Sequence, residues 1–278
     1  LAVGTRFHPP MLMWEDHKQK KLIRIDTDQR RAADPWVADI HITATAKISL
    51  SGIYDKVGRH NIRRLSREDE FTTYKQAAVK KFSQGQPQAS YGKAIRTVLP
   101  EDGIACFGVT QMGFFSWFGF PTYFPRTNIQ PGYQGTLGYA FPTGLGAQVA
   151  NPDKKVVAVT GDGGFMFNVQ EMATAVLHNI PLVTILFNDN TFGNVKRNQK
   201  ERYNERYICS DLFNPDFMKL AESFGMASFR VDTPEGLEAA LDKAFTEDGP
   251  VLIEVEIGEM PSLWPYMPLK TVKANLPS

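Results

Sequence analysis

The chain has 278 residues, 42% of them hydrophobic, and 31 Lys and Arg against 30 Asp and Glu. This composition is typical of a globular protein, and the near-neutral charge removes the electrostatic case for nucleic acid or an acidic membrane as a partner. No apolar run reaches the ~20 residues that a bilayer requires, and Cys106 and Cys209 show no metal-ligand spacing. We therefore expect no membrane or nucleic-acid partner, and a reducing, cytoplasmic location.

The first part of the chain contains two short strand-like runs, 22–26 and 38–42, each bounded by charged stretches. The chain opens on LAVGT, an apolar strand that runs into a turn, without a Met or a polar leader. We interpret residues 1–61 as the C-terminal part of an α/β domain, and the sequence as a piece of a longer protein. Residues 62–88 are rich in charge and contain no sustained apolar strand, which indicates a linker with room for one exposed helix.

From Ala89 onward, helix-like and strand-like segments alternate. Strands are expected at 104–108, 156–160, 182–188, 229–231 and 251–257. Helices are expected at 89–99, from Thr143, at 215–224, and from Thr233 to Phe245, where an N-cap is followed by proline. This alternation predicts an α/β fold with a doubly wound parallel sheet over residues 89–260, followed by a C-terminal tail at 261–278.

Two turns that follow expected strands carry candidate chemistry. Gly161-Asp162-Gly163-Gly164 follows the strand at 156–160, and Asp189-Asn190-Thr191 follows the strand at 182–188. Ligands of open parallel sheets bind at the carboxyl ends of the strands, so both aspartates are expected at the same edge. Carboxylate oxygens suit Mg²⁺, and the glycines let a phosphate approach backbone N–H groups beside a helix amino end. The pair predicts a Mg²⁺-bridged diphosphate.

The helix after the first turn is expected to begin at a capping box, because Asn168 and Glu171 have the N-x-x-E spacing. Taken alone, the glycine turn is also typical of a tight βα turn in which the glycines serve geometry and the aspartate caps a helix.

The segment GDGGFMFNVQEMATAVLHNIPLVTILFNDN resembles the thiamine diphosphate (ThDP) motif, in which GDG is followed after nearly thirty residues by a paired Asn. Residues from about 89 to 257 are similar to the diphosphate-binding domain of ThDP enzymes of the acetolactate synthase, pyruvate decarboxylase and benzoylformate decarboxylase group. Residues 1–61 resemble the tail of their central domain. The resemblance implies a ThDP- and Mg²⁺-dependent lyase or carboligase that acts through a thiazolium ylid on a 2-oxo acid or an α-hydroxyketone.

The resemblance also implies roles for particular residues. Asp162 and Asp189 would be Mg²⁺ ligands together with the backbone carbonyl of Thr191. The family usually has Asn where Asp189 stands, so the additional carboxylate should make Mg²⁺ more necessary for cofactor binding. GTLGYAFP, which begins at Gly135, is similar to the family's G-x-(M/L)-G-F-x-L-P segment. Leu137 would wedge the cofactor into its bent V conformation, and the carbonyl of Gly135 would accept from the amino group of the aminopyrimidine. The other implied cofactor contacts are Thr110, Gln111, Gly161, Gly163, Gly164, Phe192 and Gly193.

Ylid formation in this family needs a glutamate bonded to the pyrimidine N1′, which a separate pyrimidine-binding domain supplies across a subunit interface. No residue of this chain matches that glutamate, so we expect the chain to provide the diphosphate-binding half of a site in a homodimer or homotetramer. The stretch TRFHPP, from Thr5 to Pro10, resembles the place where acetolactate synthase has an R-F-D-D-R run associated with its flavin, but it lacks the acidic pair.

Two alternative functions remain open at this point. One is a ThDP-dependent 2-oxo acid oxidase that passes electrons to a flavin. The other is a non-catalytic module that binds a nucleotide phosphate with the GDGG turn, although it would not explain Leu137 or Asp189.

Two segments also have two interpretations each. The aromatic stretch from Phe114 to Phe124 is core or subunit interface, or else an apolar substrate pocket that favours aromatic or branched 2-oxo acids. It is too irregular to predict an amphipathic helix. The Pro-rich tail at 261–266 is a lid over the cofactor or a loosely packed terminus.

Overall fold

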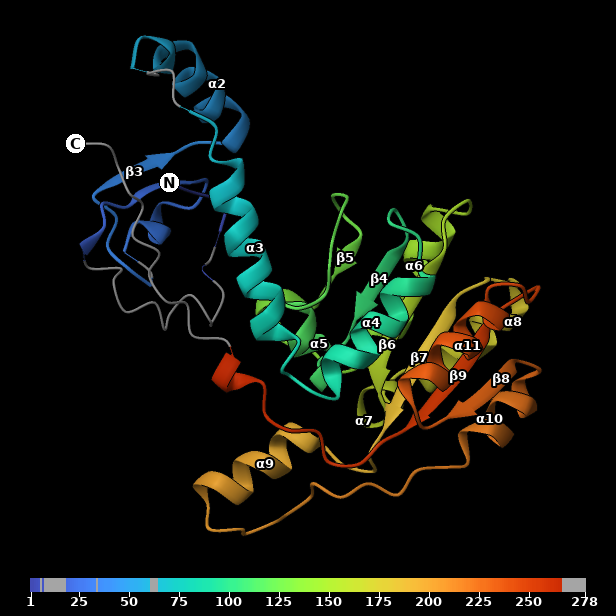
Figure 1. Cartoon of the computed structure of the whole chain (residues 1–278). Coiled ribbons are helices and arrows are strands. Elements are labelled where there is room, and N and C mark those ends of the chain that lie inside the picture. Colours follow the sequence, from blue (N-terminus) through green and yellow to red (C-terminus); the bar gives the residue numbers. More distant parts are fainter. Residues whose placement is uncertain (6, 8–18, 34, 61–64, 267–278) are drawn as a thin grey trace. The chain divides into compact units, whose positions relative to one another are not determined.

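The computed structural model describes residues 1–5, 7, 19–33, 35–60 and 65–266 (Figure 1). The chain divides into two compact units, one of residues 1–75 with the C-terminal residues from Trp264, and one of residues Gln76–Leu263. The division lies inside the segment 62–88 that the sequence suggests as a linker. Helix α3 (Glu68–Phe82) covers most of this segment and has no buried residue.

The N-terminal unit contains a three-stranded parallel sheet in the order β1 (Ala2–Val3), β2 (Ile23–Asp26), β3 (Ile40–Thr43). A short 3-10 helix η2 (Gln29–Ala32) lies between β2 and β3, and helix α2 (Ala46–Val57) with η3 (Gly58–His60) follows. The predicted strands at 22–26 and 38–42 are thus present, with small shifts of their ends. Helix α2 was not expected, and its start is fixed by the Thr45 hydroxyl, which accepts a hydrogen bond from the Ile48 N–H over 3.4 Å.

The Gln76–Leu263 unit is built on a six-stranded sheet in the order β5-β4-β6-β7-β9-β8. The strands are β4 (Ile104–Phe107), β5 (Asn128–Ile129), β6 (Val156–Gly161), β7 (Val183–Asn188), β8 (Ala227–Val231) and β9 (Val251–Glu256). All neighbouring strands are parallel, which confirms the predicted doubly wound sheet. The chain runs from β4 to the edge strand β5 and returns to β6 on the other side of β4, so the order reverses at β4.

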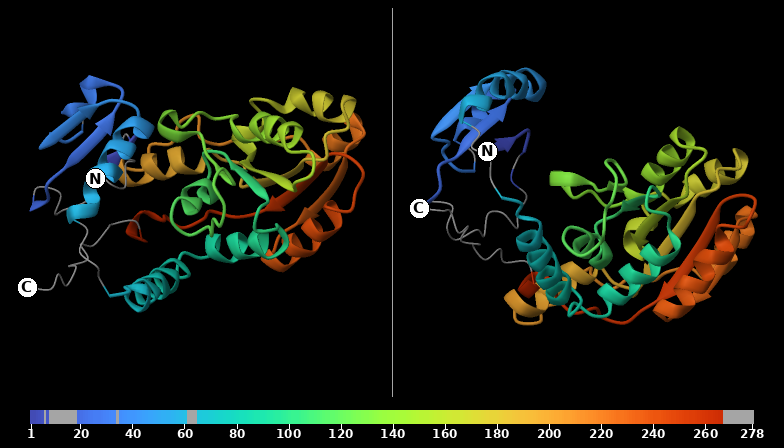
Figure 2. Two further views of the ribbon diagram at one scale, coloured as in Figure 1. Left: turned by 90° about the horizontal axis from the view of Figure 1, so that it is seen from above. Right: turned by 45° about the horizontal axis from the view of Figure 1, so that its top comes forward.

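Helices cover both faces of this sheet, which explains why β4, β6, β7 and β9 are almost continuously apolar instead of alternating. Helix α4 (Gln88–Val98) lies beside α11 (Pro234–Ala244) on one face. Helices α6 (Ala140–Ala150), α8 (Met172–Leu177) and α10 (Phe217–Phe224) pack on the other face, where residues from all three share one buried cluster. Figure 2 shows the sheet between these two helical layers.

Four shorter or more polar elements lie at the carboxyl end of the sheet. They are α5 (Gln111–Ser116), α7 (Asp162–Phe165), η5 (Val169–Glu171) and α9 (Gly193–Arg202). Helix α5 shows that part of the aromatic stretch is helical after all. The remaining short elements are the 3-10 turns η4 (Gly132–Gln134) and η6 (Trp264–Tyr266).

The predicted start of α11 is confirmed, since Thr233 Oγ1 accepts from the Gly236 N–H at 3.1 Å and Pro234 is the first helical residue. By contrast, the helix expected from Thr143 begins three residues earlier, at Ala140. Pro142 then lies in the first turn, where a helix tolerates proline because the N–H groups of that turn have no partner within the helix.

The expected capping box at Asn168 and Glu171 is wrong. Asn168 is the N-cap residue of η5, but its side chain makes no capping hydrogen bond. Its Nδ2 donates instead to the carbonyl oxygen of Gly138 at 2.6 Å, and the Glu171 carboxylate accepts from the Thr174 hydroxyl at 2.7 Å. The Asn168 side-chain amide therefore bonds to Gly138, which is distant in the sequence, and not to the start of the helix that its spacing to Glu171 suggests.

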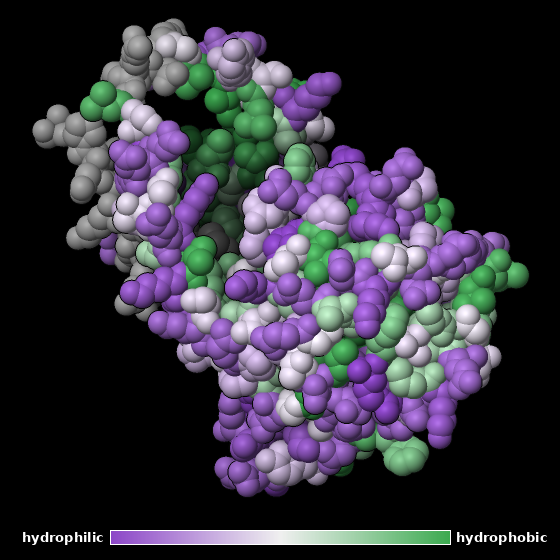
Figure 3. Space-filling model, turned by 45° about the vertical axis from the view of Figure 1, so that its right-hand side comes forward, coloured by the Kyte–Doolittle hydropathy of each residue, from purple (hydrophilic) through white to green (hydrophobic). Residues whose placement is uncertain are grey.

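In the described parts of the chain, no helix has the length and hydropathy needed to cross a membrane. Figure 3 shows hydrophilic side chains over most of the visible surface of the Gln76–Leu263 unit, with hydrophobic ones scattered between them. Cys106 is buried and Cys209 is exposed, and both are free thiols.

Candidate functional site

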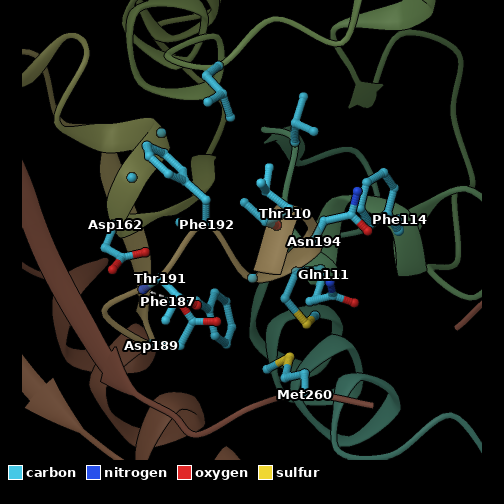
Figure 4. Close-up of a pocket in the computed structure, with 18 of the residues that line it drawn as sticks. Thr110, Gln111, Phe114, Asp162, Phe187, Asp189, Thr191, Phe192, Asn194 and Met260 are labelled. Carbon is cyan, nitrogen blue, oxygen red and sulfur yellow. Dashed lines mark hydrogen bonds between the residues drawn. The ribbon is translucent and has the colours of Figure 1, made fainter. Parts of the chain in front are cut away.

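A cavity of about 230 Å³ lies at the carboxyl ends of the central strands, next to the reversal of strand order at β4 (Figure 4). This is the place where open α/β sheets bind their ligands. Every position that the sequence predicts for the site lines this one cavity: Thr110, Gln111, Gly135, Leu137, Gly161, Asp162, Gly163, Gly164, Asp189, Thr191, Phe192 and Gly193. Residues that are far apart in the sequence are therefore brought together as expected.

Asp162 and Asp189 define the acidic end of the cavity, and Asp162 is the more buried of the two. It is the first residue of α7, directly after β6, and only 2% of its surface is exposed. Its Oδ2 accepts a hydrogen bond from Asn214 Nδ2 at 2.7 Å. Burial raises the pKa of Asp162 to about 6, and the neighbouring charge of Asp189 adds to the rise, against the effect of the hydrogen bond from Asn214. A second acidic group so close to a buried carboxylate is typical of a cation site.

Asp189 follows β7 and organises the turn at the acidic end. Its Oδ1 accepts from the Thr191 N–H at 3.0 Å and from the Thr191 hydroxyl at 3.1 Å. Between them Asn190 adopts a left-handed conformation, with φ 55°. Burial raises the pKa of Asp189 as well. The turn fixes the backbone of Thr191, whose carbonyl the sequence predicts as a ligand.

Two glycines at this end have no room for a side chain. A Cβ on Gly163 would lie 2.5 Å from Cε1 of Phe192, and a Cβ on Gly193 would lie 2.9 Å from Oδ2 of Asp189. Phe192 therefore packs directly on the GDGG turn, and α9 starts directly beside the Asp189 carboxylate. The sequence predicted Phe192 and Gly193 as cofactor contacts, and the structure gives them this second, steric role.

Leu137 projects into the cavity from a tight loop between η4 and α6. The loop contains two glycines in the left-handed region, Gly135 with φ 58° and Gly138 with φ 78°. Asn168, which follows the GDGG turn and α7, holds the loop through its hydrogen bond to the carbonyl oxygen of Gly138. Asn168 was not predicted as a site residue, because its spacing to Glu171 suggested a helix cap.

The opposite end of the cavity combines apolar side chains with two amides. Phe114 and Met260 lie there together with Gln111 and Asn194, and Val195 also lines the cavity. Thr110, which precedes Gln111 in the chain, caps α5, because its hydroxyl accepts a hydrogen bond from the Gly113 N–H at 2.9 Å.

Of the aromatic stretch, Phe115 and Phe120 are buried, with 3% and 6% of their surfaces exposed, whereas Phe114 lines the cavity. Core packing is therefore confirmed for Phe115 and Phe120. Phe114 lies on the cavity wall, as a substrate pocket would require, and its role there stays a prediction.

The segment after β9 closes this end, and the residues that hold it were not predicted. Arg197 of α9, 8% exposed, donates through Nη2 to the carbonyl oxygen of Met260, and its Nη1 lies 3.5 Å from Oε1 of Gln111. Gln88 Nε2 donates to the next carbonyl, that of Pro261, at 2.8 Å. Residues 257–263 thus form an anchored wall of the cavity, so the interpretation of a loosely packed terminus is wrong for residues 261–263. Only Met260 could have been found from the sequence, because it lies shortly after the end of a strand.

The acidic end suits a divalent cation, although two carboxylates alone do not complete a coordination shell. Within the described residues no group of three or more His, Cys, Asp or Glu side chains could hold a metal ion. Asp162 and Asp189 would therefore need a backbone carbonyl and oxygen atoms of a ligand to complete the octahedron that Mg²⁺ prefers. The described lining of this cavity contains no Lys, Arg or His. Lys196 lies close enough to lower the pKa of Asp189, but its ammonium group is paired with Asp211 at 2.5 Å. The donor set fits Mg²⁺ carried by an anionic ligand.

Comparisons with known proteins identify the family. Residues 108–255, more than half of the chain, match the family model "Thiamine pyrophosphate enzyme, C-terminal TPP binding domain". The probable acetolactate synthase large subunit of Methanococcus aeolicus is 42% identical over 152 residues, which cover 54% of this chain and 25% of that protein. The acetolactate synthase isozyme 2 large subunit of Escherichia coli K12 is 39% identical over 145 residues, which cover 52% of this chain and 26% of that protein.

A solved structure shows the same fold. The thiamine diphosphate-dependent 4-hydroxybenzoylformate decarboxylase of Rhodococcus jostii RHA1 superposes with a TM-score of 0.68 at 24% identity, covering 86% of this chain and 44% of that chain. The matched region spans about a quarter of the length of the two acetolactate synthase relatives. The chain belongs to the thiamine pyrophosphate enzymes and contains their C-terminal TPP-binding domain.

Proposed function

We propose that the cavity binds the diphosphate end of ThDP through Mg²⁺, with Asp162, Asp189 and the carbonyl oxygen of Thr191 as the protein ligands. The observation that carries this proposal is the buried carboxylate of Asp162 beside the half-buried carboxylate of Asp189, in a cavity whose described lining residues include no Lys, Arg or His. A bound cation would remove the repulsion between the two aspartates. An anionic diphosphate could not approach them without it, so cofactor affinity should depend strongly on Mg²⁺.

The residues around the acidic end would contact the diphosphate itself. Gly163 and Gly164 offer a backbone without side chains at the turn after β6, and Thr110 and Gln111 line the cavity after β4. Leu137 would support the bent cofactor between its two rings, and the backbone carbonyl of Gly135 would accept a hydrogen bond from the amino group of the pyrimidine. These assignments agree with the place of each residue on the cavity wall.

When bound, ThDP supplies a thiazolium ring that adds to a carbonyl carbon and accepts the electron pair released when a C–C bond breaks. We propose that the whole protein is a lyase or carboligase of this kind, a 2-oxo acid decarboxylase or an acetolactate synthase-like enzyme. Its substrate would be a 2-oxo acid or an α-hydroxyketone. The activating glutamate would come from a pyrimidine-binding domain outside this chain, within a homodimer or homotetramer.

The apolar end of the cavity is the proposed place for the substrate side chain. Phe114 and Met260 provide apolar side chains there, and Gln111 and Asn194 provide the polar groups. This combination favours 2-oxo acids with an aromatic or branched side chain over pyruvate. Truncation of Phe114 to Ala in the assembled enzyme should reduce that preference when kcat/KM values for the two classes are compared.

Titration calorimetry of ThDP tests the proposal. Binding is expected in the presence of Mg²⁺, and it should disappear in EDTA and in the Asp162→Ala variant. The matched control is Asp153→Ala, because Asp153 is an exposed aspartate in the turn before β6. Binding that survives both EDTA and Asp162→Ala would contradict the proposal.

The same titrations separate the alternative functions. Equal affinity for Mg²⁺–ATP and Mg²⁺–ThDP would favour the nucleotide-phosphate module. A flavin spectrum in the purified longer protein would favour the ThDP oxidase. The structure does not address the flavin-associated stretch at Thr5 to Pro10, because most of it lies outside the described residues.

A further inference from the structure

A relay of side-chain hydrogen bonds leads from Asp162 into the interior of the sheet. Asn214 Nδ2 donates to Asp162 Oδ2 at 2.7 Å and also to Asn188 Oδ1 at 3.0 Å. Asn188 Nδ2 donates to Glu254 Oε1 at 2.8 Å. Arg230 Nε donates to the other carboxylate oxygen, Glu254 Oε2, at 2.8 Å. Glu254 lies in β9 with only 2% of its surface exposed and does not line the cavity.

The chemistry of the groups fixes the direction of this relay. An ionised carboxylate can only accept hydrogen bonds, whereas an amide has a donor end and an acceptor end. Glu254 therefore forces Asn188 to present Nδ2 to it and Oδ1 to Asn214. Asn214 must then turn its own Nδ2 toward Asn188 and Asp162, where Asn190 Oδ1 is a third acceptor at 3.2 Å. One Asp162 oxygen is engaged in this way, and backbone hydrogen bonds from Gly163 and Asn190 also act on this carboxylate.

Glu254 also fixes the chain segment that carries Asn214. Two residues after Asn214, the Asp216 carboxylate accepts from Arg230 Nη2 at 2.8 Å, and the same guanidinium contacts Glu254. The segment 214–216 thus also contacts Arg230, but the hydrogen bonds that connect Glu254 to Asp162 run through Asn188 and Asn214 and do not include Arg230. The buried carboxylate of Glu254 costs free energy unless Asn188 and Arg230 both bond to it. This cost keeps the three side chains in one geometry.

We propose that Glu254 is a positioning residue for the cation site: through Asn188 and Asn214 it orients the Asp162 carboxylate toward Mg²⁺. This inference rests on the proposed function, because it takes Asp162 as a cation ligand. Partners of metal ligands commonly contribute about 10- to 100-fold to metal affinity.

The first test compares Glu254→Gln with Arg230→Gln in the full chain. Both variants remove the same ion pair, but only Glu254→Gln removes an acceptor. Because a glutamine has a single acceptor oxygen, it cannot satisfy Asn188 and Arg230 together. Glu254→Gln is expected to raise the Mg²⁺ concentration for half-maximal ThDP binding by about tenfold or more, and Arg230→Gln by less than about threefold. Equal effects of the two variants would overturn the inference.

The second test uses a variant at the accessible end of the relay. Asn214 lies in a partly exposed loop, so Asn214→Leu should fold, and it should produce the same rise in the Mg²⁺ requirement. In the double variant with Glu254→Gln the two effects should not add, since both act through one relay. Additive effects would overturn the inference, and Asn188→Ser replaces Glu254→Gln in this cycle if the latter fails to fold.

The side-chain amide signals in NMR spectra of the ligand-free chain provide a readout that needs no cofactor. The Asn188 and Asn214 signals should shift in Glu254→Gln and stay in place in Arg230→Gln. Unchanged signals in Glu254→Gln would overturn the inference even when the wild-type chain binds Mg²⁺–ThDP. A wild-type chain that binds no Mg²⁺–ThDP would contradict the proposed function first, and the positioning role would fall with it.

Discussion

The side-chain amide of Asn168 is joined to the backbone carbonyl of Gly138 by a hydrogen bond of 2.6 Å. Asn168 follows the GDGG turn and α7, whereas Gly138 follows Leu137 in the loop before α6. A Cβ on Gly138 would lie 2.4 Å from the same Nδ2 atom, so the contact requires a glycine. The two walls of the cavity, one acidic and one carrying Leu137, are thereby fixed relative to each other.

This relationship leads to a prediction for Leu137 itself. In the assembled enzyme, Leu137→Ala should lower turnover of a 2-oxo acid by about tenfold or more, because small displacements of reacting groups are costly. Its effect on ThDP affinity should be much smaller, since the diphosphate end stays intact. Steady-state kinetics and titration calorimetry measure the two quantities, with Leu137→Met as the control that keeps the apolar bulk. An equal loss in both quantities would count against the supporting role.

Asn168→Ala should show a weaker form of the same pattern. The variant removes the donor to the Gly138 carbonyl but leaves every group of the acidic end in place, so turnover should fall more than ThDP affinity. Thr174→Val is a suitable control, because it removes only the hydrogen bond from Thr174 to Glu171. Loss of Mg²⁺-dependent binding in Asn168→Ala would show that Asn168 acts on the diphosphate end instead.

Asp162→Asn should separate cofactor binding from stability. The variant removes a negative charge that is 2% exposed and close to Asp189, and asparagine can still accept the hydrogen bond from Asn214. Mg²⁺-dependent ThDP affinity should be lost, while the free energy of unfolding of the metal-free chain should rise by about 1–2 kcal/mol, as is common when a functional charge is removed. Chemical denaturation in EDTA measures the second effect, and Asp153→Asn is the exposed control. A lower free energy of unfolding would contradict the idea that Asp162 is kept at a cost to stability.

The sequence predicted most of the sheet and much of the acidic end, for physical reasons. The central strands are short apolar runs between turn residues, and a parallel sheet that is covered on both faces has this pattern. Asp162 and Asp189 could be found because residues at the carboxyl ends of such strands meet at one edge. Leu137 required the family resemblance, since nothing in its local pattern distinguishes it from a core leucine.

What could not be predicted depends on contacts between distant residues. Helix α9 is polar almost throughout, with Arg197 as its buried residue, so it has no apolar periodicity. Asn214 bonds to residues 26 and 52 positions away, and no local pattern reports such partners. Asn168 shows the opposite case, in which a local pattern was present and a tertiary contact overrode it.

A pair of glycines in α6 provides a test of the packing on the sheet. A Cβ on Gly144 would lie 2.9 Å from Cβ of Ala158 and 3.1 Å from both Cδ atoms of Leu182, whereas a Cβ on Gly146 would meet nothing within 4 Å. Gly144→Ala should destabilise the chain by about 1–3 kcal/mol through overpacking. Gly146→Ala should stabilise it by up to about 1 kcal/mol, because alanine is the better helix former. If the denaturation midpoints of both variants moved in the same direction, that result would contradict this packing.

Arg197 leads to a prediction about the wall of the cavity. Arg197→Met would leave the buried carbonyl of Met260 without its donor, and an unsatisfied buried group costs about 1–3 kcal/mol. Because Gln88 would still hold the carbonyl of Pro261, the segment 257–263 should loosen locally while the sheet stays folded.

Limited proteolysis should therefore cut Arg197→Met within 257–263 faster than the wild-type chain. The control is Arg202→Met, which changes an exposed residue in the last turn of the same helix and should leave the cleavage rate unchanged. The cavity is lined by both Met260 and Ile257, so the loosened variant should also bind Mg²⁺–ThDP more weakly. Cleavage at the wild-type rate would mean that the packing of Met260 and Leu263, which are 2% and 3% exposed, holds the segment without the help of Arg197.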